Sequence, residues 1–283
     1  MWCHHRNIAT HNFKSPIACI TKLGDNSFKH FKCPSGHSRW KQGAQDKSIE
    51  SILNQTFTDF EFIIIDDGST DRTPDIIKKY ETDKRVIAIP QENIGLTKSL
   101  NKAIKIARGE LIARQDADDI SLKERLLYLV NEFKKNPTLV LCGTRAVIRS
   151  GELCYESKML DDNEILDKIY YYNPFIHSSV MFNKKKFIEI GMYDETYSTT
   201  QDYDAWLRLK KLGKIKIIDN VLVERVINDN SISKKKLFQQ CINSFKIRRI
   251  YISNYVNILM TLYQFISNSL PESLLKILKK NKS

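Results

Sequence analysis

The sequence predicts an α/β protein with a mostly parallel central sheet, helices on both faces of that sheet and a helical C-terminal tail. Strand and helix patterns alternate along the middle of the 283-residue chain, and the predicted strands are almost entirely apolar. Strands that are apolar on both faces are typical of parallel sheets, in which a helix connects each strand to the next.

The predicted elements alternate from residue 48 onward. In chain order we expect a helix over 48–55, a strand over 62–65, a helix over 74–80, a strand over 85–89, a helix over 95–107, a strand over 110–114 and a helix over 121–135. Thr73 and Pro74 are typical of a helix start, as N-cap and first-turn residue. In a sheet with this βαβα order, ligands bind at the carboxyl ends of the strands.

Two acidic clusters follow predicted strands directly. The sequence DDGSTD comes after the strand over 62–65, and DADD comes after the strand over 110–114, so we expect both to converge on one cleft. Closely spaced carboxylates raise each other's pKa unless a cation or hydrogen-bond donors share the charge. Asp116 and Asp118 are two apart in an extended segment and can both approach one divalent ion, Mg²⁺ or Mn²⁺, which in turn would hold a diphosphate.

Helix capping is the alternative for the second cluster. Asp119 or Ser121 can cap the following helix, with Ser121 and Glu124 forming a capping box. The first cluster is also ordinary turn chemistry. Asp116 and Asp118 precede the cap, and for them we favour contact with a metal and a nucleotide.

Five segments, in this order, resemble the successive motifs of glycosyltransferase family 2: SIESILNQTFTDFEFIIIDDGSTD, ENIGLTKSLNKAI, GELIARQDADDISLKERL, NPFIHSSVMF and TQDYDAWLRL. The resemblance runs from about Ser48 to Asn230. It implies an inverting enzyme with the GT-A fold, a catalytic domain over 48–230, a nucleoside-diphosphate-sugar donor (a UDP-sugar is commonest) and Mn²⁺ or Mg²⁺ as cofactor.

The resemblance also implies roles on the donor side. Asp67 would contact the base or ribose of the nucleotide-sugar, and Asp116 and Asp118 would bind the ribose and the metal, with Asp118 as the more direct ligand. Asn93 lies in the family's loop beside the nucleotide, although an asparagine before a glycine also makes an ordinary turn. His177 corresponds to a histidine near donor and acceptor, although a single histidine is often a packed side chain.

Asp202 resembles the general base of the family. It would take the proton from the acceptor hydroxyl as that oxygen attacks the anomeric carbon from the face opposite the departing nucleoside diphosphate, which inverts the configuration. The metal would stabilise charge on the leaving phosphate. Asp202 and Asp204 also precede a predicted helix over 205–211, where either can complement the helix dipole. With the other motifs present, we assign Asp202 as the base and leave Asp204 as structural.

Residues 1–47 depart from the family pattern and form an atypical N-terminal segment. Members open with a buried strand shortly before the segment matched by 48–55, whereas 32–40 has no apolar run. The nearest substitute is PIACIT at 16–21, about 27 residues upstream of Ser48. Either an insertion separates strand from helix or the strand is lost, which would remove half of the base pocket. The alternative function is therefore a catalytically impaired relative.

The chain has a formal net charge of +12, which predicts anionic partners. Residues 231–283 carry many of the lysines and arginines, on both sides of an uncharged stretch over 250–270. We expect a basic amphipathic helical tail in peripheral contact with the cytoplasmic inner face of a membrane. A helical pair packed on the catalytic domain is the alternative. Nucleic acid is disfavoured, because the basic residues do not form a stripe with exposed aromatics.

The sequence therefore predicts a metal-dependent glycosyltransferase that adds a sugar to a cell-surface polysaccharide or glycolipid. A nucleotidyltransferase with a similar metal site is disfavoured, since QDYD fits attack by a hydroxyl on a sugar and no glycine-rich, lysine-bearing phosphate loop opens the sequence. We expect the six cysteines to be free thiols.

Overall fold

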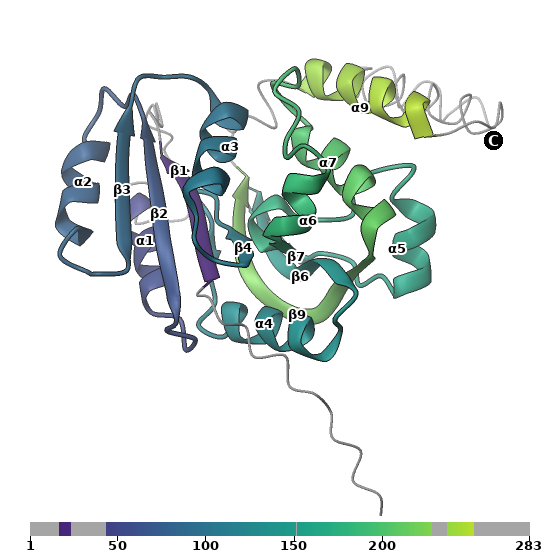
Figure 1. Cartoon of the computed structure of the whole chain (residues 1–283), viewed down its shortest axis with the longest axis horizontal. Helices are drawn as coiled ribbons and strands as arrows, with labels where there is room; N and C mark the ends of the chain where they lie inside the picture. Colours follow the sequence, from purple (N-terminus) through teal and green to yellow (C-terminus); the bar gives the residue numbers. More distant parts are fainter. Residues whose placement is uncertain (1–16, 24–43, 151, 228–236, 252–283) are drawn as a thin grey trace, which may run out of the picture.

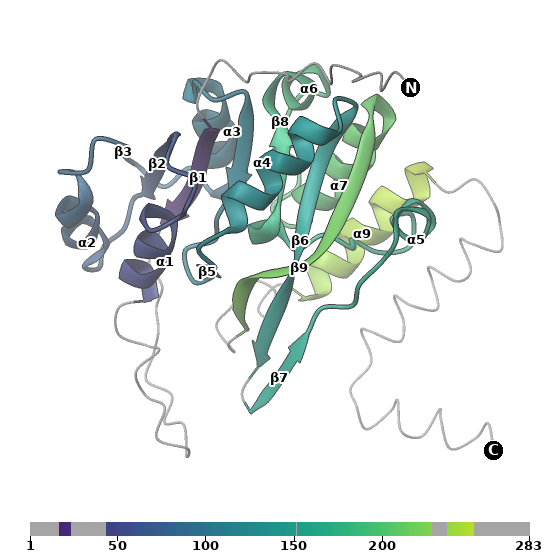
Figure 2. The same ribbon diagram turned by 90° about the horizontal axis from the view of Figure 1, so that it is seen from below.

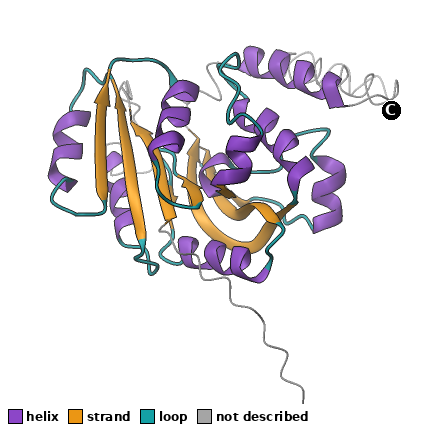
Figure 3. Ribbon diagram, viewed as in Figure 1, coloured by secondary structure: helices purple, strands orange, loops and turns teal. Residues whose placement is uncertain are grey.

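The computed structural model of the chain describes residues 17–23, 44–150, 152–227 and 237–251. The described strands form one nine-stranded sheet, and helices cover both of its faces (Figures 1 and 3). This is the α/β architecture that the sequence predicts.

The strand order is β3-β2-β1-β4-β8-β6-β9-β5, with β7 paired to β6. The first four strands are parallel: β3 (Val86–Gln91), β2 (Phe60–Asp67), β1 (Ile17–Leu23) and β4 (Leu111–Arg114). The rest of the sheet is mixed and comprises β8 (Met181–Asn183), β6 (Leu139–Ser150), β9 (Lys214–Ile227), β5 (Ile120–Ser121) and β7 (Leu153–Glu156). Chain order reverses between β1 and β4, which makes the carboxyl ends of these two strands a topological switch point.

The first strand is present, in the centre of the parallel half. β1 pairs with β2 on one side and with β4 on the other, and Ala18, Cys19 and Ile20 are at most 1% exposed. The segment 16–21 therefore supplies the strand, and an insertion separates it from the next helix. The N-terminal segment 1–47 thus contributes a strand to the sheet, and the reason for expecting an impaired enzyme is removed.

Two layers of helices form two cores, one on each face of the sheet. Side chains alternate along β2, so that Phe62 and Ile64 face one core and Ile63 and Ile65 the other. The first core includes residues of α1 (Ala44–Leu53), α2 (Thr73–Tyr80) and α4 (Arg125–Lys135). The second includes residues of α3 (Leu96–Ile106), α5 (Asp162–Lys168), α6 (Lys184–Glu189), α7 (Gln201–Leu209) and α9 (Leu237–Tyr251).

Several helix starts differ from the prediction, because side chains expected to cap a helix bond elsewhere. Thr73 is already helical, with Arg72 in the cap position. The helix expected from 121 begins at Arg125, since Ser121 belongs to β5 and its hydroxyl donates to Gln115 Oε1 at 2.7 Å. The Ser121–Glu124 capping box is not formed.

Two 3₁₀ turns and one helix complete the described structure. After β7 and α5, a 3₁₀ turn, η2 (His177–Ser179), precedes β8, and a second turn, η3 (Lys210–Leu212), follows α7. The described part of the tail is α9, which Figure 2 shows beside α7. Within the described ranges, no helix is both long and apolar enough to cross a bilayer. Most of the stretch 250–270 lies outside them.

Candidate active site

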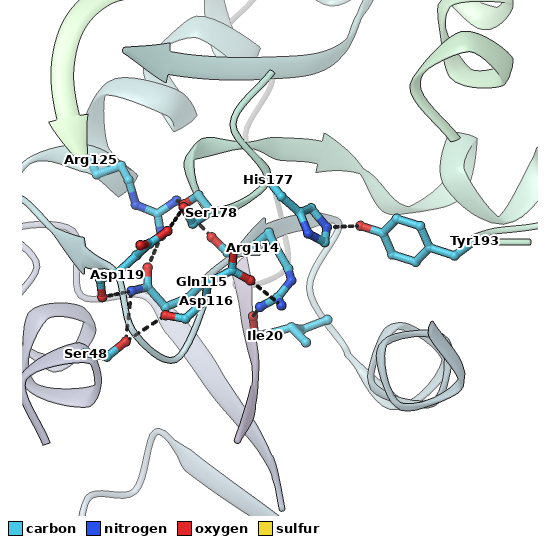
Figure 4. A network of polar contacts seen from close by, with 10 residues as sticks. All are labelled: Ile20, Ser48, Arg114, Gln115, Asp116, Asp119, Arg125, His177, Ser178 and Tyr193. Atoms are coloured by element: carbon cyan, nitrogen blue, oxygen red, sulfur yellow. Dashed lines mark hydrogen bonds and ion pairs between the residues drawn. The ribbon is translucent and has the colours of Figure 1, made fainter. Parts of the chain in front are cut away.

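The second acidic cluster lies at the carboxyl end of β4, next to β1 (Figure 4). The buried guanidinium of Arg114 donates to Asp116 Oδ1 at 2.6 Å and to the Ile20 carbonyl of β1 at 3.1 Å. Burial alone would raise the pKa of Asp116, but nearby positive charges, that of Arg114 first, hold the pKa below its usual value. Asp116 is thus kept ionised by a cation of the chain itself.

Asp118 is in a different electrostatic position. Burial and, next, the negative charge of Asp116 raise the pKa of Asp118 to about 6. A divalent cation would offset this repulsion, and carboxylate oxygens suit Mg²⁺ and Mn²⁺. Within the residues that the structure describes, no group of three or more acidic, histidine or cysteine side chains could hold a metal ion. The residues present fit a cation held by one or two carboxylates, with phosphate oxygens and water as the other ligands.

Asp119 joins the acidic cluster to two other segments. The residue is 2% exposed, and its carboxylate accepts hydrogen bonds from Ser178 Oγ and, at 3.4 Å, from the Val226 N–H of β9. Burial, followed by the charges of the two preceding aspartates, raises the pKa of Asp119 well above its usual value. The alternative in which Asp119 or Ser121 caps α4 is wrong, because both side chains are bonded elsewhere.

Two fully buried side chains, those of Gln115 and Arg125, fix the acidic loop that follows β4. Gln115 donates to the Ser48 hydroxyl of α1 at 3.0 Å. Arg125, at the start of α4, donates from Nη1 to the carbonyls of Arg114 and Ser178, both at 3.1 Å. The acidic loop is therefore tied to α1, α4 and η2 by groups that solvent does not reach.

Asp67, at the end of β2, is completely buried and accepts four hydrogen bonds. Its Oδ1 accepts from the Ile94 N–H at 3.0 Å and from the Gln91 and Ser99 side chains at 2.6 and 2.9 Å. Its Oδ2 accepts from the Gly95 N–H at 3.0 Å. Asp67 thus fixes the loop that connects β3 to α3.

Asn93 lies exposed in that loop. The turn after β2 packs closely against it, since a Cβ on Gly68 would lie 2.8 Å from the Asn93 nitrogen. Gly68 also has a φ of 72°, a conformation that glycine adopts without steric cost. The turn and the loop therefore depend on each other.

His177 lies between the acidic cluster and α7. Its Nε2 makes a hydrogen bond with Tyr193 Oη at 3.0 Å, and its ring packs edge-on against Tyr193 and Trp206 (Figure 4 shows the tyrosine). Burial lowers the pKa of His177, and the negative charges of Asp202 and Asp116 oppose that shift. The loop after β4, through Asp116, and the start of α7, through Asp202, therefore both act electrostatically on this imidazole.

Asp202 lies half-buried in the first turn of α7. Its Oδ2 accepts a hydrogen bond from Asn173 Nδ2 at 2.7 Å. Its other oxygen makes no hydrogen bond to any part of the chain that the structure describes. Asp204 instead pairs with Arg208 of its own helix at 2.6 Å. Asp202 is thus oriented by one neighbour and keeps one oxygen available.

The structure places the predicted site residues in two groups. Four of them lie in the loop after β4, in η2 and in the first turn of α7, and the charges of Asp116 and Asp202 act on the histidine: Asp116, Asp118, His177 and Asp202. Two lie at the ends of the neighbouring strands: Asp67 and Asn93. The sequence motifs did not single out Arg114 or Asn173. The position of a charged residue at the end of an apolar strand could have indicated Arg114. Asn173 opens the NPFIHSSVMF segment, but nothing in the sequence indicated that its side chain binds Asp202.

The sequence profile of Glycosyl transferase family 2 matches residues 46–192 of the 283. The chain belongs to glycosyltransferase family 2. Both β1 and Asp202 lie outside the matched region, so the family 2 assignment does not depend on either of them.

Two curated family 2 members illustrate the likeness. The chain is 32% identical to the chondroitin synthase of Escherichia coli over 207 residues. This alignment covers 71% of this chain but only 29% of that enzyme. It is also 32% identical over 230 residues to the O-antigen biosynthesis glycosyltransferase WbnJ of Escherichia coli, 78% of this chain and 89% of that protein. This chain therefore spans less than a third of the synthase.

Solved structures show the same GT-A fold. S. aureus TarS (residues 1–349), in complex with UDP-GlcNAc, superposes with a TM-score of 0.62 at 16% identity, over 89% of this chain and 72% of that one. The mannosyltransferase PcManGT from Pyrobaculum calidifontis, in complex with GDP-Man and Mn²⁺, superposes with a TM-score of 0.59 at 15% identity, over 94% of this chain and 80% of that one. This chain is a glycosyltransferase with a GT-A fold.

Proposed function

We propose that this family 2 member is an inverting enzyme that transfers a sugar from a nucleoside-diphosphate sugar to a hydroxyl of a glycan or lipid-linked acceptor. The observation that carries the proposal is that the charges of both Asp116 and Asp202 act on His177, with Asp118 beside Asp116 at the switch point of the sheet. The nucleotide-sugars bound to TarS and PcManGT support such a donor, with uridine or guanosine diphosphate as the leaving group.

On the donor side, we assign the nucleotide to the ends of β1, β2 and β4. Asp67 acts there by fixing the loop that carries Asn93, because four donors already occupy its buried carboxylate. Its direct contact with the base or ribose stays a prediction, as does that of Asn93. Burial lowers the pKa of His177, which favours the neutral imidazole between the loop after β4 and the start of α7.

On the acceptor side, Asp202 acts as the general base. Its available oxygen accepts the acceptor proton as the hydroxyl oxygen bonds to the anomeric carbon and the bond to the diphosphate breaks on the opposite face. Asn173 fixes the rotation of the carboxylate during this transfer. A single displacement of this kind inverts the anomeric configuration.

Asp118 and Asp116 would hold Mg²⁺ or Mn²⁺, with Asp118 as the more direct ligand since Arg114 already engages one oxygen of Asp116. When bound, the ion supplies charge stabilisation for the leaving diphosphate. The Mn²⁺ in PcManGT supports this assignment.

For the acceptor, the relatives that make chondroitin and O-antigen support a polysaccharide or glycolipid. The net charge of +12 supports peripheral contact with an anionic membrane, which we place at the cytoplasmic face. We propose no nucleic-acid partner.

The test is calorimetric titration of UDP and of GDP, with and without Mn²⁺, into the wild-type protein and Asp118→Asn. Asp75→Asn, on the exposed surface of α2, is the matched control. We expect binding that requires Mn²⁺, is lost in Asp118→Asn and is retained in the control. Binding of neither nucleotide to folded wild-type protein would contradict the donor assignment.

A further inference from the structure

The helix α9 lies outside the family 2 match and contacts the segment that leads into α7. The side chain of Asn243 is buried, and its Nδ2 donates to the Thr199 carbonyl and the Thr199 Oγ1, both at 3.1 Å. Gln239, one turn earlier, donates to Asn243 Oδ1 at 2.9 Å. Both ends of the Asn243 amide are therefore engaged, and its orientation is fixed.

The segment that Asn243 holds is strained. Thr200 is the cap residue of α7 and has a φ of 62°, which is rare for a β-branched residue. Its hydroxyl donates back to the Thr199 carbonyl and does not cap the helix. Such a conformation persists only where the surroundings enforce it. Asp202 follows two residues later, in the first turn of α7.

α3 holds the other end of the same segment. Asn101 donates to the Tyr193 carbonyl at 2.8 Å and accepts from the Tyr193 N–H at 3.1 Å, and Thr97 donates to the Tyr197 carbonyl at 3.0 Å. Residues 193–197 are thus fixed by α3, while Thr199 is fixed by α9.

Apolar contacts secure α9 against α7. Ile247 is completely buried in the core that contains Trp206. Burial raises the pKa of Tyr203 of α7 to about 12, and the positive charge of Arg248 of α9 opposes that shift. Ile247 of α9 thus shares a core with Trp206 of the helix that carries Asp202, and Asn243 is the polar contact of α9 with the strained turn.

We propose that Asn243 is a positioning residue for the transfer step, which holds the Thr199–Thr200 turn so that the Asp202 carboxylate is correctly placed. The inference rests on the proposed function of Asp202. It assigns to the tail a part in catalysis that is separate from any contact with a membrane.

The experiment is a double-variant cycle with Asn243→Ala and Asp202→Asn, and with Lys246→Ala, exposed on the same helix, as control. The first readout is kcat for hydrolysis of the donor, UDP-GlcNAc or GDP-Man, whichever binds, with water as the acceptor and release of the nucleoside diphosphate as the signal. The second readout is the Kd of the free nucleoside diphosphate. We expect Asn243→Ala to lower kcat by about 10- to 100-fold, as small displacements of a reacting group do. The nucleotide Kd should not change, and Lys246→Ala should match the wild type.

The cycle separates a positioning role from general loosening. If Asn243 acts through Asp202, then Asn243→Ala adds no further loss in the Asp202→Asn background. The inference would be overturned if Asn243→Ala had the kcat of the wild type, or if the fold-losses of the two single variants multiplied in full in the double variant. In either case, a loss of kcat in Asp202→Asn would still support Asp202 as the general base. Wild-type kcat in Asp202→Asn would overturn both. If Asn243→Ala does not fold, Asn243→Asp replaces it in the cycle, because this variant keeps the side-chain volume and removes the amide donor.

Discussion

Arg114 places a permanent positive charge at the end of a buried strand, two residues before the first of three closely spaced aspartates. Its two hydrogen bonds join the acidic loop of β4 to the backbone of β1, so one side chain serves both the charge balance and the packing of the switch point. Breaking a buried ion pair by removing one partner is costly, because the other charge loses its compensation.

We expect Arg114→Met, which keeps much of the apolar stem, to lower the free energy of unfolding by about 1–3 kcal/mol at pH 7. Urea denaturation measures this. Arg149→Met, which removes a half-exposed pair with Glu224 at 3.7 Å, is the control and should cost little. Equal stability of the two variants would contradict the role of Arg114.

The pH dependence of stability tests the same pair. Since the pKa of Asp116 is lower in the folded protein than in the unfolded chain, its ionised form contributes stability that is present at neutral pH. That contribution is lost as the pH falls below about 4 towards the folded-state pKa. In Arg114→Met we expect the free energy of unfolding to fall less steeply with decreasing pH over this acidic range. Denaturation at a series of pH values measures this. An unchanged pH profile would contradict it.

At the scale of elements, the turn after β2 and the loop before α3 form one unit around Asp67. The unit depends on Gly68 for two reasons: its φ is 72°, and a Cβ added at this position would lie only 2.8 Å from the Asn93 nitrogen. Gly191 separates the two effects, because its φ is 84° but nothing lies within 4 Å of a Cβ there.

We expect both Gly68→Ala and Gly191→Ala to destabilise the protein by about 1 kcal/mol or more through backbone strain. Gly68→Ala should cost more, because it also displaces Asn93, and it alone should weaken nucleoside-diphosphate binding. Thermal unfolding and calorimetry measure the two effects. Equal nucleotide affinity in both variants would argue against a role of this loop in donor binding.

At the scale of the whole molecule, local patterns predicted most of the parallel half, because each strand there is a short apolar run between amphipathic helices. The positions of Asp116, Asp118 and Asp202 followed from motifs at the ends of those elements. The residues that hold these aspartates or their neighbouring segments did not, since Arg125, Asn173 and Asn243 bond across long stretches of chain. Likewise, only the pairing of β1 with both β2 and β4 shows that residues 17–23 belong to the sheet.

Thiol labelling tests the position of β1 directly. The four described cysteines are free, as expected, and Cys19 of β1 and Cys142 of β6 are completely buried while Cys154 is exposed. Burial raises the pKa of Cys19 to about 11, which further lowers its reactivity because the thiolate is the nucleophile. In native protein we expect N-ethylmaleimide to modify Cys154 rapidly and Cys19 and Cys142 only after unfolding. Rapid native labelling of Cys19, read by peptide mass spectrometry, would contradict the placement of β1.

The central place of β1 has a consequence for how the chain acquires its fold. This strand is synthesised before the others, yet it pairs with β4, and Ile20 and Arg114 are 94 residues apart in the chain. Contacts of such long range carry a large loop-closure entropy and slow folding. During synthesis β1 therefore has both edges unpaired until its neighbours emerge, and the switch point closes only when β4 docks.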